Sequence, residues 1–598
     1  MNIIKLSPLV KPINAGVKIP PSKSYTNRAL LLSALNSSPV KILNPLISDD
    51  TKAMIDCLKT LGIKILEKQN YIKVYPNLNK IPNRTYRLNA NLSGTTIRFI
   101  LALSTIIPGT KIIFGEEGLN KRPISELVDG LTQLGAKIEY LDKKGFPPVK
   151  VTSSKLRTGD IKIKGSISSQ YLSAILMIAP LVGRVSIQIT GNQISKPFID
   201  MTIDIMKYFG VNILNENYRK YTIPTGQKYS AKKYLVEADY SSAGYFAAIA
   251  ALTKSQITLK NINPKTKQAD INFITILRDM GNIIAGGKND LIITGIGIKP
   301  VSVNMENCPD QIQTLAVLAS FAKGITKISG VQSLRIKETN RITALKNELK
   351  KMGIKVLSTK NTLKIYGGNP KPVCIETYGD HRMAMAFAIA GTKLSGMEIS
   401  EPDVVNKTFP SFWKQLESIG VKSEYNEKNI VLIGMRGSGK STVAKILAEK
   451  LKKEYLELDK LVAEKAGLTI PEMVEKYGWT FFRDKESETA NKVSFENNKI
   501  ISTGGGVILR QENIDVLKKN GVFIFLNASI KTLIKRIGNY SKLPSLTNKK
   551  TPEEELGLVL KQRKQLYRKT ADEVIETDNL TSRQVAEEII SKLVGYNL

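Results

Sequence analysis

A chain of 598 residues exceeds the size at which a single hydrophobic core stops growing, so we expect at least three compact units. Hydrophobic residues make up 42% and charged residues 24%, which is typical of a globular protein and excludes a disordered chain. The formal net charge is +35, from 88 Lys and Arg residues against 53 Asp and Glu residues. Uninterrupted apolar runs stay far below the roughly 18 residues of a membrane-spanning helix, so we expect no membrane partner.

The positive excess allows three explanations. Nucleic-acid binding would gather the basic residues on one face within a recognisable module, and the sequence has no such module. Anionic substrates would need a few cations that converge in clefts, whereas a solvated lysine-rich surface needs no partner. We assign most of the excess to the surface and a small set of residues to anionic small molecules, with no nucleic-acid partner.

Cysteine and histidine usage limits the available chemistry. Cys57, Cys308 and Cys374 lack paired spacing, so we expect neither a disulfide framework nor a zinc site. His381 is the only histidine, so any histidine-based acid–base step must use it. The N-terminus lacks the apolar stretch of a signal peptide, and we expect a cytoplasmic protein.

An internal repeat dominates the first 425 residues. Six segments end an amphipathic helix, place a glycine and continue as a short apolar strand, as in residues 57–66 (CLKTLGIKIL) and 349–357 (LKKMGIKVL). Glycine adopts the left-handed turn at a helix end at the lowest cost. The spacing of 67 to 75 residues predicts six copies of one α+β unit. The six glycines are Gly62, Gly135, Gly210, Gly281, Gly353 and Gly420.

Within this repeat, several motifs combine cations, hydroxyls and carboxylates. Lys23, Ser24 and Arg28 stand at the start of an apolar helix, which suits an anion at a helix N-terminus. The later motifs are LSGTTIR (92–98), KRP (121–123), SSQ (168–170), SKPFID (195–200), NCPD (307–310), RIKETNR (335–341), DHRMAM (380–385) and NKTFP (406–410). This ordered set resembles EPSP synthase over essentially all of residues 1–425. The resemblance implies two subdomains of three βαββαβ-like units each, formed by residues 1–19 with 237–425 and by residues 20–236.

The resemblance also implies a reaction. The enolpyruvyl group of phosphoenolpyruvate would pass to the 5-hydroxyl of shikimate 3-phosphate, and two anionic substrates held together need a dense cationic cleft. The residues expected to hold shikimate 3-phosphate are Lys23, Ser24, Arg28, Ser168, Ser169, Gln170, Ser195, Asp310 and Lys337. Those expected to hold phosphoenolpyruvate are Lys23, Gly94, Arg122, Gln170, Arg341, Arg382 and Lys407.

Catalytic roles follow from the same resemblance. Asp310 is the expected base on the hydroxyl, Glu338 the carrier of protons at the methylene carbon, and Lys23 a candidate acid. His381 would orient Glu338 or relay a proton, and the alternative is a structural histidine. No metal or organic cofactor is implied for this half. Three positions depart from the family pattern without loss of a charged residue: Leu92, Phe198 and Ser333.

A polar segment, residues 423–428 (SEYNEK), is expected to bridge to a region of alternating strands and helices, which indicates a parallel α/β sheet. Residues 434–441 (GMRGSGKS) fit the phosphate-loop pattern between an apolar strand and a helix. Backbone N–H groups of such a loop surround phosphates, its lysine neutralises them and its hydroxyl holds Mg²⁺. We therefore expect catalytic Lys440, the Mg²⁺ ligand Ser441, and ATP at Gly437, Ser438, Gly439, Lys440, Ser441 and Thr442.

The remaining motifs suggest the phosphoryl acceptor. ELD (457–459), FR (482–483), TGGG (503–506) and QRKQLY (562–567) stand in the order of shikimate kinases, and this resemblance covers nearly all of 429–598. It implies that Asp459 orients or deprotonates the attacking hydroxyl of shikimate, that Arg483 and Arg563 clamp its carboxylate, and that Gly505 admits its ring. Two positions depart from the pattern. Glu457 replaces an aspartate, and Leu543 replaces a lid arginine whose charge Lys542 could supply.

We therefore predict an α/β and α+β multidomain protein, with a two-domain EPSP-synthase-type fold before a P-loop kinase. Its expected partners are shikimate, ATP, shikimate 3-phosphate and phosphoenolpyruvate, and its oligomeric state stays open. One alternative is an RNA-associated P-loop ATPase, which gives no reason for the order of Asp459, Arg483 and Arg563. A transferase of the same fold acting on a UDP-sugar is the other, and the KETNR and DHRMAM stretches and the kinase-like tail argue against it.

Overall fold

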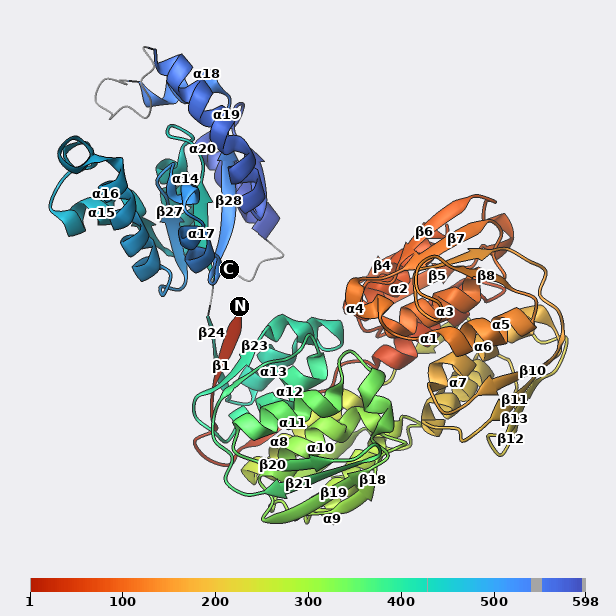
Figure 1. Ribbon diagram of the computed structural model, residues 1–598. Coiled ribbons are helices and arrows are strands. Elements are labelled where there is room, and N and C mark those ends of the chain that lie inside the picture. Colours follow the sequence, from red (N-terminus) through yellow and green to blue (C-terminus); the bar gives the residue numbers. More distant parts are fainter. Residues whose placement is uncertain (1, 427, 539–550, 594–598) are drawn as a thin grey trace. The chain divides into compact units, whose positions relative to one another are not determined.

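The computed structural model describes residues 2–426, 428–538 and 551–593 (Figure 1). The chain separates into a larger unit, Lys5–Ser423, and a smaller unit formed mainly by Glu424–Leu598. Among the described helices, none is both long enough and apolar enough to cross a membrane.

The larger unit contains six four-stranded sheets, and in each of them two strands pair in parallel. In five sheets an antiparallel hairpin continues the sheet, whereas the last two strands of the sixth come from opposite ends of this unit. Three are β14(Lys233–Leu235)-β3(Val40–Leu43)-β5(Tyr71–Tyr75)-β4(Lys64–Lys68), β6(Thr85–Asn89)-β7(Thr110–Phe114)-β9(Val149–Thr152)-β8(Lys137–Tyr140) and β10(Gly159–Lys164)-β11(Val185–Thr190)-β13(Lys220–Ile223)-β12(Leu214–Glu216). The others are β2(Asn14–Lys18)-β15(Gln256–Lys260)-β17(Asp290–Thr294)-β16(Ile283–Gly286), β18(Ser302–Asn304)-β19(Gly324–Ser329)-β21(Thr362–Gly367)-β20(Lys355–Ser358) and β22(Cys374–Ile375)-β23(Met397–Ser400)-β1(Ile3–Ser7)-β24(Lys422–Asn426).

Each repeat carries one amphipathic helix that ends at the predicted glycine. All six glycines have positive φ, from +82° to +102°. The residue after each glycine donates its N–H to a carbonyl five positions earlier, as Ile354 does to Leu349 at 2.9 Å. This bond satisfies a carbonyl that the helix end leaves free. The predicted junctions are confirmed, in α2 (Asp49–Thr60), α5 (Ser125–Gln133), α7 (Lys196–Tyr208), α9 (Asn272–Asp279), α11 (Arg341–Lys351) and α13 (Phe412–Ser418).

Six further helices of the larger unit are almost wholly buried, because they are apolar around most of their circumference. α3 packs against α1 and α6, while α8, α10 and α12 pack against one another. Five of the nine predicted site motifs stand at the N-terminus of one of them, where the helix dipole is positive. Their bounds are α1 (Lys23–Ala34), α3 (Gly94–Ser104), α6 (Ser169–Val182), α8 (Tyr240–Thr253), α10 (Ile312–Ser320) and α12 (His381–Gly391).

Short elements complete this unit, and one of them corrects an expectation. The segment predicted as a polar bridge begins as strand β24, which lies at one edge of its sheet. An edge strand tolerates charged side chains because one side has no partner strand, so its composition resembled a linker. The short helices are α4 (Glu117–Asn120), η1 (Leu78–Lys80), η2 (Ala269–Ile271), η3 (Pro309–Gln311), η4 (Gln332–Ile336) and η5 (Pro402–Lys407).

The smaller unit is a five-stranded, all-parallel sheet with helices on both faces, as predicted (Figure 1). Its order is β26(Glu454–Glu457)-β27(Lys499–Ser502)-β25(Asn429–Ile433)-β28(Gly521–Asn527)-β29(Glu573–Glu576). Ile430 and Leu432 face α14 and α20, whereas Val431 and Ile433 face the helices of the other side. The helices are α14 (Lys440–Leu451), α15 (Leu458–Ala466), α16 (Ile470–Val493), η6 (Val507–Leu509), α17 (Gln511–Lys518), α18 (Ile530–Ile537), α19 (Pro552–Thr570) and α20 (Ser582–Lys592).

Candidate active sites

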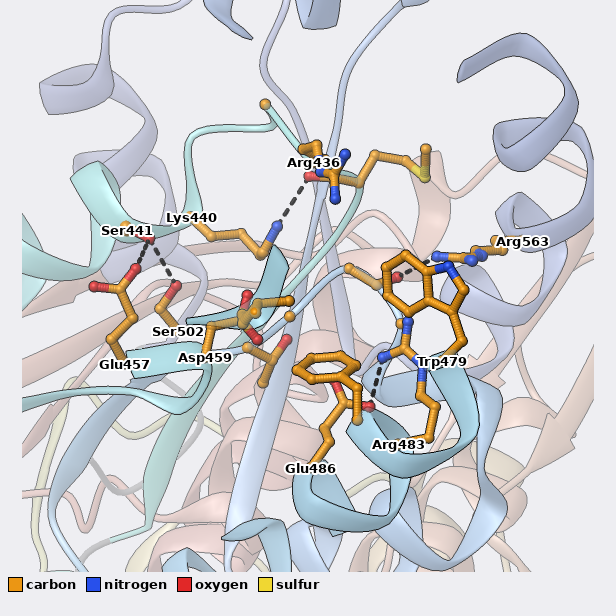
Figure 2. Close-up of a pocket in the computed structure, with 18 residues that line it drawn as sticks. Arg436, Lys440, Ser441, Glu457, Asp459, Trp479, Arg483, Glu486, Ser502 and Arg563 are labelled. Carbon is orange, nitrogen blue, oxygen red and sulfur yellow. Dashed lines mark hydrogen bonds and ion pairs between the residues drawn. The ribbon is translucent and has the colours of Figure 1, made fainter. Parts of the chain in front are cut away.

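The first site lies where β25, β26 and β27 end, at the carboxyl edge where parallel sheets bind ligands. A cavity of about 230 Å³ is lined there by the phosphate loop, by the residues after β26 and β27, and by side chains of α16 and α19 (Figure 2). Of the expected kinase residues, it gathers Gly437, Lys440, Ser441, Asp459, Arg483, Gly505 and Arg563.

The phosphate loop holds its lysine inside the cavity. Lys440 Nζ donates to the carbonyl oxygens of Gly434 and Met435, each at 2.9 Å. No carboxylate accepts from it among the described residues. Burial lowers the pKa of Lys440 to about 8, while Asp459 opposes this change. The ammonium therefore lacks a counter-ion where a phosphate would supply one.

An oxygen cluster stands beside it and fits Mg²⁺. Ser441 Oγ donates to Glu457 Oε1 at 2.7 Å and lies 3.3 Å from Ser502 Oγ (Figure 2). Mg²⁺ prefers oxygen ligands and usually takes only one or two carboxylates, with waters and substrate phosphates in the other positions. Glu457, although one methylene longer than the expected aspartate, reaches the predicted metal ligand.

Arg483 and Arg563 both face the cavity. Arg483 Nη1 pairs with Glu486 Oε2 at 2.6 Å, and Glu486 is fully buried. The Arg483 guanidinium also lies 5.4 Å from the ring centroid of Trp479, as Figure 2 shows beside the pair. Arg563 Nη1 donates to the Gly505 carbonyl at 3.0 Å. Burial raises the pKa of Asp459, partly offset by Lys440 and Arg483, and one of its oxygens has no partner among the described residues.

Two of the three glycines after β27 leave no space for a Cβ unless a neighbouring side chain moves. A Cβ at Gly504 would lie 2.5 Å from Asp459 Oδ1, and one at Gly506 would lie 2.0 Å from Arg483 Nη2. At Gly505, the residue predicted to admit the ring, the nearest atom would be 3.4 Å away. The closest approaches are thus at the two flanking glycines, which the sequence motif contained but did not single out.

A groove of about 420 Å³ on the outer side of the phosphate loop contains the other expected nucleotide residues, Ser438, Gly439 and Thr442. Arg536 of α18 lines it and donates to Ser438 O at 3.3 Å and to Thr577 O at 2.7 Å. The sequence prediction missed Arg536 and Thr577, although Thr577 directly follows β29 at the same edge of the sheet. Lys542 and Leu543 lie outside the described residues.

The second site lies in the larger unit. One cavity is lined by all nine residues expected to hold shikimate 3-phosphate. An adjoining cavity is lined by six of the seven residues expected at phosphoenolpyruvate and by the candidate catalytic residues Glu338 and His381. The seventh, Lys407, lies 3.5 Å from Glu338 Oε1. The residues shared by the two cavities are Lys23, Thr95, Gln170, Asp310 and Lys337.

Ion pairs fill the adjoining cavity. Arg341, 1% exposed, contacts Asp380 Oδ2 at 2.6 Å, Glu338 Oε2 at 2.7 Å and Asp310 Oδ1 at 3.4 Å. Arg382 Nη2 contacts Asp310 Oδ2 at 2.9 Å. Burial alone would raise the pKa of Asp310, but Arg382 and other cations outweigh it and hold the pKa below its usual range. Burial would likewise raise the pKa of Glu338, but Arg341 and other cations hold it well below its usual value. Both carboxylates are therefore ionised counter-charges to the cations.

His381 is 1% exposed, and neither ring nitrogen has a hydrogen-bond partner among the described residues. Burial, followed by the charge of Arg382, holds the pKa of His381 well below its usual value. The imidazole is therefore neutral. The predicted orientation of Glu338 by His381 has no hydrogen bond in this structure to support it.

Several residues of this site escaped the sequence prediction. Asp50 pairs with Lys23 at 3.1 Å, and Arg98 donates to Gln170 Oε1 at 2.5 Å. Arg98 lies in the LSGTTIR motif and could have been found there, whereas Asp50, the second residue of α2, belongs to no predicted motif. Ser241 and Asp270, which connect to Arg382 through hydrogen bonds, also belong to none of the predicted motifs.

Known proteins resemble both units. Residues 9–416 match the family model of EPSP synthase (3-phosphoshikimate 1-carboxyvinyltransferase), and residues 436–594 match that of shikimate kinase. A 3-phosphoshikimate 1-carboxyvinyltransferase of Sulfurovum sp. (strain NBC37-1) is 39% identical over 425 residues, which covers 70% of this chain and 99% of that protein.

Two further similarities cover different shares of the chain. Pentafunctional AROM polypeptide 1 of Lodderomyces elongisporus is 32% identical over 98% of this chain, which matches 41% of that protein. A solved EPSP synthase from Acinetobacter baumannii aligns with a TM-score of 0.60 over 71% of this chain and 100% of its own. At 23% identity, that likeness shows the fold alone.

Proposed function

We propose that this chain, which belongs to the EPSP synthase family and carries a shikimate kinase region after it, catalyses two consecutive reactions at the two sites described above. The kinase site phosphorylates shikimate with ATP. The transferase site then moves the enolpyruvyl group of phosphoenolpyruvate to the 5-hydroxyl of the product. The observation that carries the residue assignment is that all nine residues expected at shikimate 3-phosphate line one cavity.

The transferase cations and carboxylates suggest how the site changes when its substrates bind. Asp310 and Glu338 neutralise the arginines in the structure without ligands. Two anionic substrates would take over part of that neutralisation, which removes the cause of the depressed carboxylate pKa. Asp310 then becomes a stronger base for the 5-hydroxyl, and Glu338 can exchange a proton at the methylene carbon. A proton adds to the methylene carbon, which becomes a methyl group, while the hydroxyl oxygen bonds to the phosphate-bearing carbon. Loss of phosphate together with one methyl proton then restores the double bond.

In the kinase site, the chain supplies position and charge. Lys440 and the loop N–H groups hold the phosphates, and Asp459 accepts a hydrogen bond from the attacking hydroxyl. Arg483 and Arg563 hold the carboxylate of shikimate through their guanidinium groups. Mg²⁺ at Ser441 and Glu457 would neutralise phosphate charge when bound. Burial raises the pKa of Asp459, so its ionised carboxylate is a stronger base for that hydroxyl as well as its hydrogen-bond acceptor.

We assign the transferase to residues 1–425 and the kinase to residues 429–598. Within the transferase, residues 20–236 form one subdomain, and residues 1–19 with 237–425 form the other. The assignment is supported where the chain would cross between them: Ser22 N donates to Glu237 O and Asp239 N to Pro20 O, each at 2.8 Å. Two adjacent crossings of this kind form a double connection.

The test supplies the full chain with shikimate, ATP, Mg²⁺ and phosphoenolpyruvate. We expect 5-enolpyruvylshikimate 3-phosphate, ADP and phosphate by mass spectrometry and coupled assay. Asp310→Ala should reduce turnover of added shikimate 3-phosphate by about 10²–10⁴-fold, because it removes the base. Lys220→Ala, at an exposed lysine outside both sites, is the matched control. Consumption of a UDP-sugar, or salt-sensitive RNA binding without this product, would favour the corresponding alternative.

A further inference from the structure

Ser241, which is partly exposed, and the buried Asp270 form a hydrogen-bonded pair next to Arg382. Asp270 lies in η2, is 4% exposed, and accepts a hydrogen bond from Ser241 Oγ. Ser241, near the start of α8, accepts in turn from Arg382 Nη2 at 3.4 Å. The same nitrogen donates to Asp310 Oδ2 at 2.9 Å. Ser241 therefore connects a buried carboxylate to the guanidinium that holds the proposed base.

A purely structural role does not explain why Asp270 is buried, because burying a carboxylate destabilises the fold. Its Oδ1 is buried and has no hydrogen-bond partner among the described residues. A buried carboxylate oxygen without a hydrogen-bond partner destabilises a fold. Its presence therefore points to a functional role more strongly than a paired oxygen does. Within the described part of the chain, Asp270 has one hydroxyl donor and no ion pair. An effect of Asp270 on Arg382 would explain why this destabilising buried carboxylate is present.

Charged groups surround Asp270 on several elements. Arg382 of α12 is the cation, while Asp310 of η3 and Asp239 before α8 are like charges. Burial, followed by Asp310, raises the pKa of Asp270 to about 7, and Arg382 and the Ser241 hydrogen bond oppose the rise. The nearby Cys308 thiol has its own pKa raised by burial and does not ionise in this range.

We propose that Asp270 is a positioning residue of the transferase: through Ser241 it aligns Arg382 for the carboxylate or phosphate of phosphoenolpyruvate, and its ionisation controls that alignment. The inference rests on the proposed transferase function. When Asp270 is ionised, it draws the Ser241 proton toward itself, which leaves the hydroxyl lone pairs facing Arg382. When Asp270 is protonated, its hydrogen bond with Ser241 is no longer charge-assisted, and the Ser241 oxygen becomes a weaker acceptor for Arg382.

The expected consequence is a pH dependence that arises from a residue that does not touch substrate. A charge-assisted hydrogen bond exceeds a neutral one by enough to raise kcat/KM for phosphoenolpyruvate about fivefold as pH rises through 7. Asp270→Asn keeps an oxygen acceptor without the charge. It should hold kcat/KM near the low-pH value of the wild type and lose this rise. Any rise from the substrate's own phosphate remains in the variant, so the difference between the two profiles measures Asp270.

Two further variants separate positioning from folding. Ser241→Ala and Asp270→Ala both disconnect Arg382, so each should raise KM for phosphoenolpyruvate about tenfold while KM for shikimate 3-phosphate changes less than about twofold. Ser242→Ala is the matched control, because Ser242 Oγ bonds Asp239 and not Arg382. Kinase turnover and the melting temperature of the same preparations report whether the chain is folded.

The outcomes are distinct. An Asp270→Asn profile that superimposes on the wild type overturns the inference. So do equal increases in both KM values together with a lowered melting temperature, since these indicate a structural role only. A wild-type chain without enolpyruvyl transfer instead contradicts the proposed function. A pH rise lost in Asp270→Asn, with KM for phosphoenolpyruvate alone raised in Ser241→Ala, supports it.

Discussion

Lys440 is a residue whose charge depends on what occupies the phosphate loop. Burial lowers its pKa to about 8, and among the described residues its ammonium donates to two backbone carbonyls and to no side chain. A bound triphosphate would favour the charged form and raise that pKa, so binding of ATP takes up a proton at high pH. We expect ATP affinity to be nearly constant below pH 7 and to fall above pH 8, by up to about tenfold per unit.

Titration calorimetry of the full chain between pH 6.5 and 9.5, in buffers of different ionisation enthalpy, measures both the affinity and the proton uptake. Lys440→Arg is the control, because arginine stays charged over this range. Its affinity for ATP should be lower but independent of pH. A wild-type affinity that does not change between pH 7 and 9.5 would contradict the assignment of this pKa to the loop lysine.

Arg483 has a structural task as well as the proposed one. Its partner Glu486 is fully buried, so Arg483→Ala leaves a buried carboxylate without its cation and should destabilise the smaller unit by about 3–5 kcal/mol. Adding Glu486→Gln removes the stranded charge and should restore much of that loss, while shikimate affinity stays low in both variants. Denaturant unfolding followed by Trp479 fluorescence, in a Trp413→Phe background, reports the stability. Equal stability of the single and double variants would show that the pair is not coupled.

At the level of elements, Gly353 tests the repeated helix ending. It has φ of +82°, and a Cβ there would meet no atom within 4 Å, so any cost of Gly353→Ala comes from backbone strain alone. We expect a loss of about 1–2 kcal/mol in the free energy of unfolding. Gly368→Ala is the matched control, because its Cβ also meets open space and its φ is ordinary. If both alanine variants unfold at the same denaturant concentration, the repeated glycines are not needed for left-handed turns.

Local requirements explain which elements could be predicted. A helix end that needs a left-handed residue leaves a glycine in the sequence, so six junctions were found from spacing alone. The pairing of strands could not be predicted in this way. For example, β2 pairs with β15 about 240 positions later, and no local pattern encodes that pairing. The same division applies to the sites. The motif at a helix N-terminus marked Lys23 as an anion ligand, and the family resemblance assigned Arg382. The role of Asp270 follows only from the structure, which connects it through Ser241 to Arg382.

At the scale of the whole molecule, the described residues that line each pair of cavities belong to a single unit. Those of the two kinase cavities fall between Met435 and Val585, and those of the two transferase cavities fall between Lys23 and Arg382. The two activities should therefore be separable by substitution: Lys440→Met should abolish shikimate phosphorylation and keep transfer to added shikimate 3-phosphate, and Asp310→Ala should do the reverse.

This separation leads to a prediction about the intermediate. If shikimate 3-phosphate leaves the kinase site into solution, an equal mixture of the Lys440→Met and Asp310→Ala variants should convert shikimate to the final product at about half the wild-type rate, after a lag. The lag appears because the intermediate must accumulate before the second site can use it. Each variant alone should give almost no final product from shikimate. A mixture that stays far below half the wild-type rate, with both single activities intact, would mean that the intermediate passes between sites of one molecule and that the fusion does more than link two enzymes.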